Sequence, residues 1–466
     1  MNEKIYDLVV IGSGPSGGRI AADMVKKGAK VLLLEAGPHF KAKDFPKPEI
    51  SSSAQMFWGG GAELSHDARL GFLRARCVGG TSIVNQALLD RFDDLVWDEW
   101  KNISGINFNA QMMEADYTAV ENSVSLQHIP EKAFGKNTKI FLKAFEQKNF
   151  GWAPLRRAQS HCDTGEQNDC MACLGGCPRN SKQSSLVTSI EPAIKLGMEL
   201  IADCEVMSIE ESAELITVHA TLKKNKQSQI YKAKALVVAA GSFGTSKILL
   251  KSGYGEKLPQ LGKGIACHPQ FMTYAMFDEQ IDAFKGAFQA VKSYDPGLRA
   301  MGLKYENVFA PPIATAMLFN GFGIQHHQQM KRYRYLASME VAIRDEASGS
   351  LRILNNGKLE IKKGLTDQDK SRAKKGVELV KEMYSGLGTK ALIPCEQGFG
   401  LHLMGGCAIG TDARKSVVNP EFKVHGSKKI FIADSSIFPS APGLNPSLTI
   451  MALSHQAIPH IEKACS

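Results

Sequence analysis

The sequence predicts an α/β fold of two domains, one built on a βαβ unit and the other on a mainly antiparallel sheet. Its 466 residues exceed the length that one hydrophobic core usually serves. A β-branched run at 8–11 leads through a glycine-rich turn into a helical pattern and a second apolar run at 31–34. Alternating apolar residues at 336–343 and a helical pattern near 367–386 are typical of a separate antiparallel sheet with a covering helix.

Composition limits the classes of protein that this chain can represent. Hydrophobic residues make up 44% and charged residues 22% of the chain, and no apolar segment has the length of a membrane span. The formal charge is +9, but the basic residues are scattered, so we do not expect nucleic-acid binding. The first apolar run begins at Tyr6 and leaves no room for a signal peptide, which predicts a cytoplasmic protein.

The first turn fits a dinucleotide-binding motif. Gly12, Gly14 and Gly17 follow the spacing G-x-G-x-x-G between the first strand and the helix. The first glycine permits a sharp turn, the second lets the backbone approach a pyrophosphate, and the third allows close packing of helix on strand. Glu35 ends the second strand, where it can accept hydrogen bonds from a ribose. This unit predicts a Rossmann-like nucleotide-binding domain and leaves FAD and NAD as alternatives.

The remaining elements follow from simpler patterns. Segment 39–75 is rich in Gly, Pro and Ser, so we expect irregular backbone around a ligand. The alternating stretch at 214–230 predicts a hairpin, and the apolar run at 235–240 predicts another buried strand. Alternating strands within 271–395 form the expected second sheet.

Four later segments, in order after the glycine turn, resemble the glucose-methanol-choline (GMC) oxidoreductases, a family of FAD enzymes. They are 76–85 (RCVGGTSIVN), 237–245 (VVAAGSFGT), 402–407 (HLMGGC) and 430–453 (IFIADSSIFPSAPGLNPSLTIMAL). The third has Gly406 where threonine is more usual in the family. The resemblance implies that FAD is the nucleotide. It also implies these further cofactor-binding residues: Gly79, Gly80, Thr81, Ser82, Asn85, Gly241, Thr245, Asp434, Asn445 and Pro446.

The resemblance divides the chain into three parts. A discontinuous FAD-binding domain takes 1–100, 183–269 and 400–466, and a mainly antiparallel-sheet substrate domain takes 270–399. Residues 101–182 form a cysteine-containing insertion between them. The chain is short for the family in the substrate domain, which predicts a more open active site.

The resemblance also implies oxidation of an alcohol, and side-chain chemistry agrees with it. When a hydride leaves a CH–OH carbon for the flavin N5, the hydroxyl proton must leave too, and histidine suits a base because its pKa lies near neutral pH. The family position of this base is His402, and its partner is Asn445, which offers both a donor and an acceptor. His268 is expected to be structural or close to the cofactor.

We therefore expect FAD-dependent oxidation of an alcohol, sugar or sterol at a CH–OH group. The reduced enzyme is expected to pass its electrons to a dedicated acceptor, such as a carrier. The alternatives are an alcohol oxidase that reduces oxygen, and a lyase or photochemical enzyme built on the same fold.

Four cysteines, Cys162, Cys170, Cys173 and Cys177, lie close together in a glycine-containing segment. In a reducing compartment such a group indicates a metal, a redox centre or packing rather than disulfides. The last three have the spacing C-x₂-C-x₃-C and precede Pro178, which is reminiscent of iron–sulfur loops, although four thiolates also suit a structural zinc. The resemblance adds that some members of the family carry a similar loop, for which thiol packing alone is a further alternative. An iron–sulfur cluster, a zinc ion and thiol packing are thus three alternatives for this segment.

Overall fold

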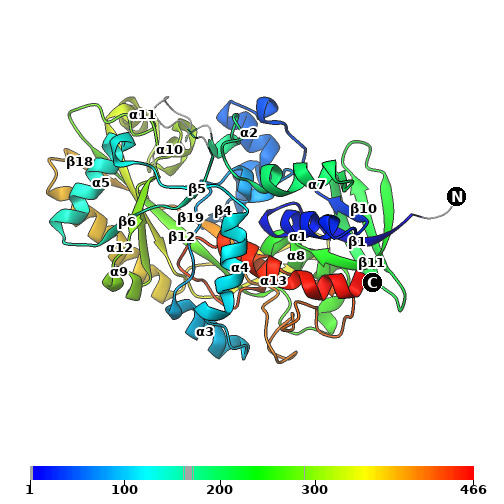
Figure 1. The fold of residues 1–466 in the computed structure, drawn as a ribbon. Coiled ribbons are helices and arrows are strands. Elements are labelled where there is room, and N and C mark those ends of the chain that lie inside the picture. Colours follow the sequence, from blue (N-terminus) through cyan, green and yellow to red (C-terminus); the bar gives the residue numbers. More distant parts are fainter. Residues whose placement is uncertain (1–3, 161, 163–170, 172, 288, 466) are drawn as a thin grey trace.

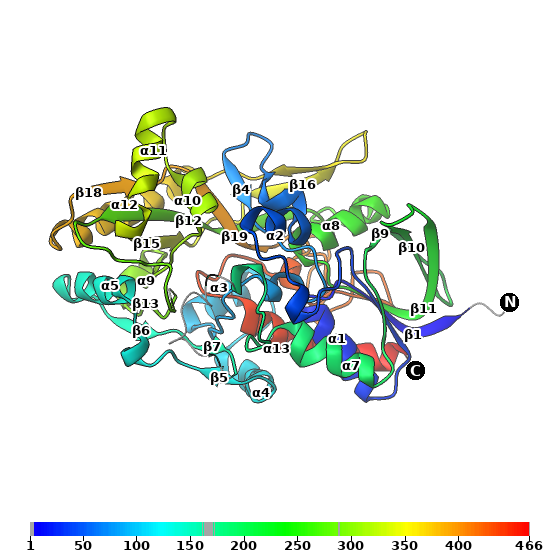
Figure 2. The same cartoon turned by 90° about the horizontal axis from the view of Figure 1, so that it is seen from above.

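Two β-sheets organise the computed structural model, which describes residues 4–160, 162, 171, 173–287 and 289–465 (Figures 1 and 2). The first sheet has the order β8-β2-β1-β11-β10-β9, with β20 beside β11. β1 runs parallel to β2 and β11, whereas β10 runs antiparallel to its two neighbours, β9 and β11. The strands are β1 (Ile5–Ile11), β2 (Val31–Leu34), β8 (Glu199–Ile201), β9 (Cys204–Glu211), β10 (Ile216–Leu222), β11 (Ser228–Val238) and β20 (Ile430–Phe431).

Helices cover the first sheet and bury its central strands. α1 (Pro15–Lys26) packs on α13 (Ser447–Cys465), and α13 also packs on β11 and on α4 (Ala110–Asn122). α8 (Gly241–Lys251) packs against β9, and α1 also contacts α7 (Glu191–Lys195). The predicted βαβ unit is therefore confirmed, with β1, α1 and β2 as its elements. Its apolar runs are continuous because β1 and β2 are almost entirely buried, with α1 packed against both.

The second sheet is larger and mainly antiparallel, as predicted. Its order is β3-β4-β19-β12-β15-β14-β13-β6, and β16 and β18 also pair with β12. The predicted strand at 336–343 is β15, in the middle of this sheet. The strands are β3 (Glu63–Leu64), β4 (Leu70–Phe72), β6 (Trp152–Pro154), β12 (Lys263–Met276), β13 (Val291–Ser293), β14 (Leu303–Glu306), β15 (Leu336–Ile343), β16 (Gly349–Ile353), β17 (Leu359–Lys362), β18 (Ala391–Pro394) and β19 (Gly398–Met404).

One long helix covers the second sheet. α12 (Asp367–Ser385) packs on β12, β15 and β18, and α5 (Lys136–Gln147) packs on α12 and β15. α12 begins with a capping box, in which Thr366 and Asp369 satisfy each other's backbone N–H groups. The helix predicted near 367–386 is thus confirmed.

The division into domains is less sharp in three dimensions than along the sequence. β12 is one continuous strand across position 269/270, where the sequence divides the two domains. Residues 101–182 contribute to both halves, because α4 packs on α13 and β6 pairs with β13. Segment 39–75, expected to be irregular, contains α2 (Glu49–Met56), β3 and β4.

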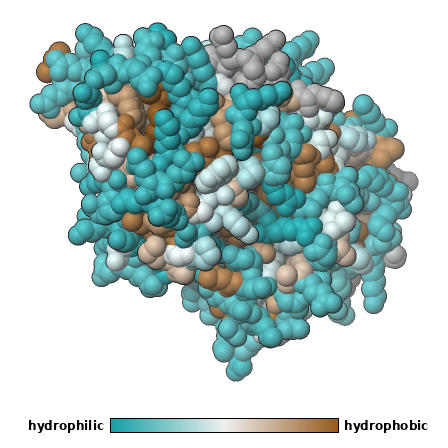
Figure 3. All heavy atoms as spheres, turned by 60° about the vertical axis from the view of Figure 1, so that its left-hand side comes forward, coloured by the Kyte–Doolittle hydropathy of each residue, from teal (hydrophilic) through white to brown (hydrophobic). Residues whose placement is uncertain are grey.

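The remaining elements are short and lie around these two layers. They are α3 (Asp94–Ser104), α9 (Pro296–Ala300), α10 (Pro312–Leu318), α11 (Gly323–Lys331) and the pair β5 (Leu126–Gln127) and β7 (Arg157–Ala158). The face of the molecule in Figure 3 is mainly hydrophilic, with smaller apolar areas. Within the part of the chain that the structure describes, no helix has both the length and the apolar character needed to cross a membrane.

A buried ion pair beside β12 allows a test of this packing. Lys363 and Asp345 lie 2.7 Å apart, and both side chains are 0% exposed. Lys363→Met leaves the Asp345 carboxylate buried without its cation, so we expect the free energy of unfolding in urea to fall by about 3–5 kcal/mol. Lys381→Met on α12 removes an exposed partner of Glu378 and should change this free energy by less than about 1 kcal/mol. Equal losses in the two variants would contradict the assigned role of the buried pair.

Candidate active site

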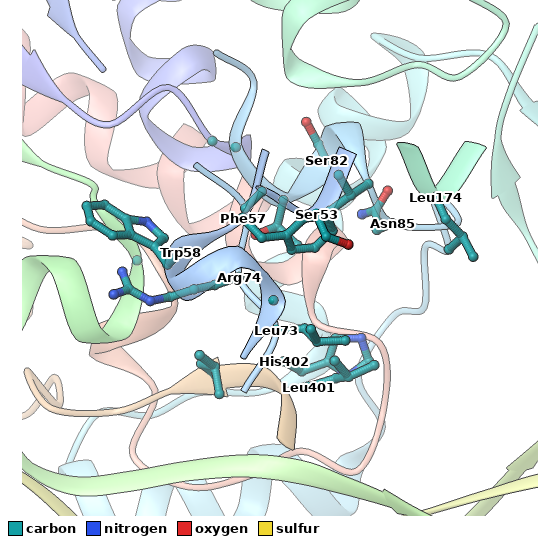
Figure 4. Close-up of a pocket in the computed structure, with 18 of the residues that line it drawn as sticks. Ser53, Phe57, Trp58, Leu73, Arg74, Ser82, Asn85, Leu174, Leu401 and His402 are labelled. Atoms are coloured by element: carbon teal, nitrogen blue, oxygen red, sulfur yellow. The ribbon is translucent and has the colours of Figure 1, made fainter. Parts of the chain in front are cut away.

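A cavity of about 960 Å³ extends from the carboxyl ends of β1, β2 and β11 to the face of the second sheet. Gly12, Glu35 and Gly241 line its first end, and Met272 and Phe399 line the other. Figure 4 shows a part of it, where side chains from several chain segments surround one pocket. The carboxyl ends of parallel strands are the usual place for a nucleotide in such sheets.

The start of α1 supplies unpartnered polar groups to the first end of this cavity. Gly14 is the N-cap of α1, and no side chain caps the helix. The Ser16 hydroxyl is buried and has no hydrogen-bond partner among the described residues. A Cβ added at Gly14 would meet no atom within 4 Å, so open space lies in front of the helix. Free amides at a helix N-terminus fit a pyrophosphate group.

The other two glycines of the motif serve packing. Gly12 has φ of 95°, and a Cβ there would lie 2.3 Å from the carbonyl oxygen of Ala239, which directly follows the neighbouring strand β11. A Cβ at Gly17 would lie 1.9 Å from the carbonyl oxygen of Gly12. Side chains at these positions would separate helix from strand, which is the reason for glycine that the motif predicts.

Glu35 lines the cavity and also orders the glycine turn. Its Oε2 accepts hydrogen bonds from the Ser13 backbone N–H at 3.1 Å and from the Ser13 hydroxyl at 2.6 Å. Its Oε1 accepts one from the N–H of Gly37 at 2.9 Å. Burial raises the pKa of Glu35, and these hydrogen bonds partly offset the rise.

The segment around 79–85 docks onto the same turn. The N–H of Gly79 donates to the Ser13 hydroxyl at 2.9 Å, and the Ser82 hydroxyl donates to the Gly79 carbonyl at 2.6 Å. Gly80, Thr81, Ser82 and Asn85 line the cavity, whereas Gly79 lies behind them.

A buried lysine joins this segment to the cysteine-containing loop. The Lys182 ammonium donates to the carbonyl oxygens of Ile83, Asn85 and Cys173 at 2.6, 2.5 and 2.7 Å. Its side chain is almost fully enclosed. The loop therefore helps to hold the cofactor-side segment in place.

The cysteine cluster itself is described only in part. Cys173 and Cys177 are buried, Cys162 is partly buried, and Cys170 lies outside the described residues. A hydrogen bond with Cys173 lowers the pKa of Cys177 to about 5, against the effect of burial. Among the described side chains, no three His, Cys, Asp or Glu residues are arranged to hold a metal ion. The metal ligands proposed from sequence thus stay a prediction, and the Lys182 contacts support the packing alternative.

Asp434 connects two of the predicted cofactor segments. Its Oδ2 accepts hydrogen bonds from the N–H of Gly241 at 2.8 Å and from the Thr245 hydroxyl at 2.6 Å. Gly241, Asp434, Asn445 and Pro446 line the cavity, and Thr245 supports them from behind.

An irregularity in β19 brings His402 to the cavity. Ala266 of β12 pairs with Met404, but His268 pairs with Leu401, so β19 has one extra residue between these pairs. His402 has φ of 55°, in the left-handed region that residues other than glycine rarely adopt. In a regular strand Leu401 and His402 would point to opposite faces. Here both line the cavity (Figure 4).

His268, on β12, forms a hydrogen-bonded pair with His402. Their Nδ1 atoms are 2.9 Å apart, and His268 Nε2 accepts a hydrogen bond from the N–H of Gly443 at 2.9 Å. Burial lowers the pKa of His268 well below its usual value. Burial, and then the charge of Lys304, lower the pKa of His402 to about 4. Both rings are therefore neutral near neutral pH.

Two carboxylates hold the amide of Asn445. Its Nδ2 donates to Asp90 Oδ2 at 3.1 Å and to Glu306 Oε1 at 3.3 Å. The Lys304 ammonium lies 3.1 Å from Asp90 and 2.6 Å from Glu306, and Lys292 also pairs with Asp90. Burial alone would raise the pKa of Asp90, but the two lysines outweigh burial and lower it. Both N–H bonds of the Asn445 amide thus donate to a carboxylate.

The sequence analysis did not single out this charged group. Asp90, Lys304, Glu306 and Glu340 belong to no recognised motif, and Glu306 and Glu340 both line the cavity. One signal was present: Glu340 lies inside an apolar strand, where a charged residue needs a reason to be buried.

Comparisons with known proteins identify the family of this chain. Two family models, both described as GMC oxidoreductase, match residues 53–270 and 358–454. A GMC-type oxidoreductase of Sinorhizobium fredii is 27% identical, over 96% of this chain and 92% of that protein. A cholesterol oxidase of Acinetobacter baumannii is 24% identical, over 99% of this chain and 95% of that protein.

Solved structures show the same fold. The structure of pyridoxine 4-oxidase from Mesorbium loti has a TM-score of 0.75 with 14% identity, covering 98% of this chain and 99% of the other. This similarity confirms the α/β fold, and the family models establish the relationship. The chain is an oxidoreductase and belongs to the GMC oxidoreductase family.

Proposed function

We propose that this protein binds FAD and oxidises the CH–OH group of an apolar alcohol. The observation that carries the proposal is the pairing of His402 and Asn445 in one cavity, each with one polar atom that has no hydrogen-bond partner among the described residues. These atoms are Nε2 of His402 and Oδ1 of Asn445. A hydroxyl group between them could use both.

The cofactor end of the cavity fits FAD. The amides at the start of α1 would hold the pyrophosphate, Glu35 would meet a ribose, and the segments at 80–85 and 434–446 would flank the rest of the molecule. When bound, FAD supplies a hydride acceptor for the alcohol carbon.

The hydrogen bonds of His268 determine which nitrogen of His402 carries a proton. Because His268 Nε2 accepts from Gly443, the neutral His268 ring has its proton on Nδ1 and donates it to His402 Nδ1. The proton of neutral His402 is then on Nε2. The sequence predicts His402 as the base, but this tautomer favours a different role, in which Nε2–H donates to the substrate oxygen and stabilises its developing charge.

Asn445 complements this donor. Its Nδ2 is engaged by Asp90 and Glu306, so its Oδ1 is the atom left to accept a hydrogen bond. A hydroxyl group both accepts and donates, and the two side chains together match it. The pair fixes the orientation of the alcohol before the reaction.

The rest of the substrate end favours an apolar molecule. Its lining residues are mainly hydrophobic: Met272, Val308, Phe309, Leu318, Phe399 and Leu401. Cholesterol oxidase, a relative over nearly the whole chain, is named for an apolar alcohol, a sterol. We therefore favour lipophilic alcohols over sugars.

The cofactor assignment is tested by Gly14→Val. The added side chain would occupy the open space before α1 and exclude the pyrophosphate, so the variant should fold but purify without flavin absorbance. Gly364→Val is a matched control, because a Cβ there also meets no atom within 4 Å and lies away from the cavity. A Gly14→Val protein with a full complement of FAD would refute this placement.

The donor role of His402 is tested by two substitutions. His402→Ala should slow anaerobic bleaching of the flavin by 1-octanol about 10²–10³-fold, the effect of losing one donor to a developing oxyanion. His402→Gln retains a donor but no base, and should recover part of this loss. His455→Gln on the outer helix α13 serves as the control. If the Gln variant is as slow as the Ala variant, His402 acts as the base that the sequence predicts.

The electron acceptor is tested by stoichiometry. The sequence favours a dedicated carrier because of the cysteine segment, whereas the cholesterol oxidase and the pyridoxine 4-oxidase that are similar to this chain are named as oxidases. An enzyme that uses a carrier should form far less than one hydrogen peroxide per alcohol oxidised in air, while an artificial dye restores rapid turnover. One peroxide per alcohol would identify oxygen as the acceptor.

A further inference from the structure

We propose that the rim of the cavity is a docking surface for an anionic lipid bilayer. Five large apolar side chains are exposed around the opening, and together they form the rim patch: Ile50, Ile313, Met317, Phe322 and Ile324. The binding of lipid by this patch is independent of the chemistry in the cavity. Its use, the direct uptake of a lipophilic alcohol from the bilayer, rests on the proposed function.

The rim patch lies where the cavity opens. Ile313 and Met317 line the cavity, yet both are exposed, Met317 to 62%, so they stand at its mouth. Phe309 and Leu318 line the same cavity and are buried. Apolar side chains thus continue from the outer surface into the substrate end.

Hydrogen bonds hold the three helices of the rim patch together. The Glu49 carboxylate, on α2, accepts from the N–H groups of Ile313 and Ala314 at 2.9 and 2.8 Å, in the first turn of α10. His326 Nε2, on α11, donates to the carbonyl oxygen of Ala316 on α10 at 2.8 Å. Figures 1 and 2 both show α11 beside α10 at the edge of the molecule. The exposed side chains therefore belong to one surface.

The apolar residues at the start of α11 point to solvent instead of into a core. The structure describes all nine residues of α11, and none of them is buried. Phe322, the N-cap of this helix, is 91% exposed, and Ile324 in its first turn is also exposed. A surface helix normally turns its apolar side chains toward the core of the protein. An exposed apolar patch beside a cavity marks an interaction site instead.

The charges around the rim patch favour an anionic bilayer over a protein partner. Residues 307–335, which include α10 and α11, contain no Asp or Glu, and Lys331 at the end of α11 is exposed. In 41–48, ahead of α2, three of the four charged residues are exposed lysines. The Glu49 carboxylate is engaged by α10. Lysines beside an apolar patch attract anionic headgroups, whereas protein–protein interfaces are depleted of lysine.

A bilayer satisfies both features of this surface. Aromatic and aliphatic side chains enter the boundary between headgroups and acyl chains, and lysine side chains extend to the headgroups. With the rim patch inserted, the mouth of the cavity faces the acyl chains. A lipophilic alcohol then enters the substrate end without crossing water.

Vesicle binding by the flavin-loaded protein without substrate gives the first test. The protein should co-sediment with vesicles of equal parts phosphatidylcholine and phosphatidylglycerol, and much less with phosphatidylcholine alone. Phe322→Asp should weaken binding to the mixed vesicles about 10-fold or more, because its apolar side chain no longer leaves water. Lys331→Glu should weaken it about 10-fold by reversing one charge. Leu196→Asp, at an exposed leucine after α7, is the matched control and should bind fully.

The source of the alcohol gives the second test. Phe322 does not line the cavity, so Phe322→Asp should slow flavin bleaching by 1-hexadecanol held in the mixed vesicles much more than bleaching by 1-octanol dissolved in water. Equal slowing with the two alcohols would contradict uptake through the rim patch.

The vesicle measurements can overturn the proposal in two ways. One is failure to bind vesicles of either composition, or equal binding by Phe322→Asp and Leu196→Asp. The other is a dimer in sedimentation velocity that Phe322→Asp dissociates, which would assign the rim patch to a second copy of the chain. Because these measurements use no substrate, failure of every alcohol to bleach the flavin would count against the proposed function and leave the docking surface in place.

Discussion

The candidate active site depends on one buried cation, Lys304. An ammonium group with 8% exposure in an apolar sheet needs carboxylates around it, and it has two, Asp90 and Glu306. Asp90 precedes α3 and Glu306 ends β14, so the lysine joins distant parts of the chain. The same carboxylates then hold the amide of Asn445, from the C-terminal segment. The charge of Lys304 thereby sets which atom of Asn445 is left for a ligand, and it helps to keep His402 neutral.

The flavin-side half could be predicted well from the sequence because its constraints are local. A strand, a glycine turn and a helix are specified by neighbouring residues, and β1, α1 and β2 formed where expected. β15 and α12 were equally clear, since alternation and helical spacing do not depend on distant partners. The sequence did not predict that β12 continues as one strand through position 269/270. Its length comes from pairing with four other strands, and such distant partners are not specified by neighbouring residues.

The candidate site was predictable only where a motif carried it. The motifs at 402–407 and 430–453 identified His402 and Asn445, and the structure brings both to one cavity. Their hydrogen-bonding directions could not be predicted, because these come from His268, Gly443, Asp90 and Glu306 in other segments. The extra residue in β19, a β-bulge, could not be predicted either. A strand rich in glycine has no regular alternation of apolar residues that such a bulge would interrupt. Glu340 stood out only as a charge in an apolar strand.

The continuity of β12 has a consequence for how molecules enter. Its first half pairs with β16 and β19 and its second half with β15 and β18, so a hinge between the two halves would break hydrogen bonds on both edges. Domain rotation is therefore an unfavourable route to the cavity. Short elements at the rim, such as the seven-residue helix α10 with its 62% exposed Met317, are held by far fewer interactions. A change in access to the cavity therefore costs fewer interactions at this rim than between the two sheets.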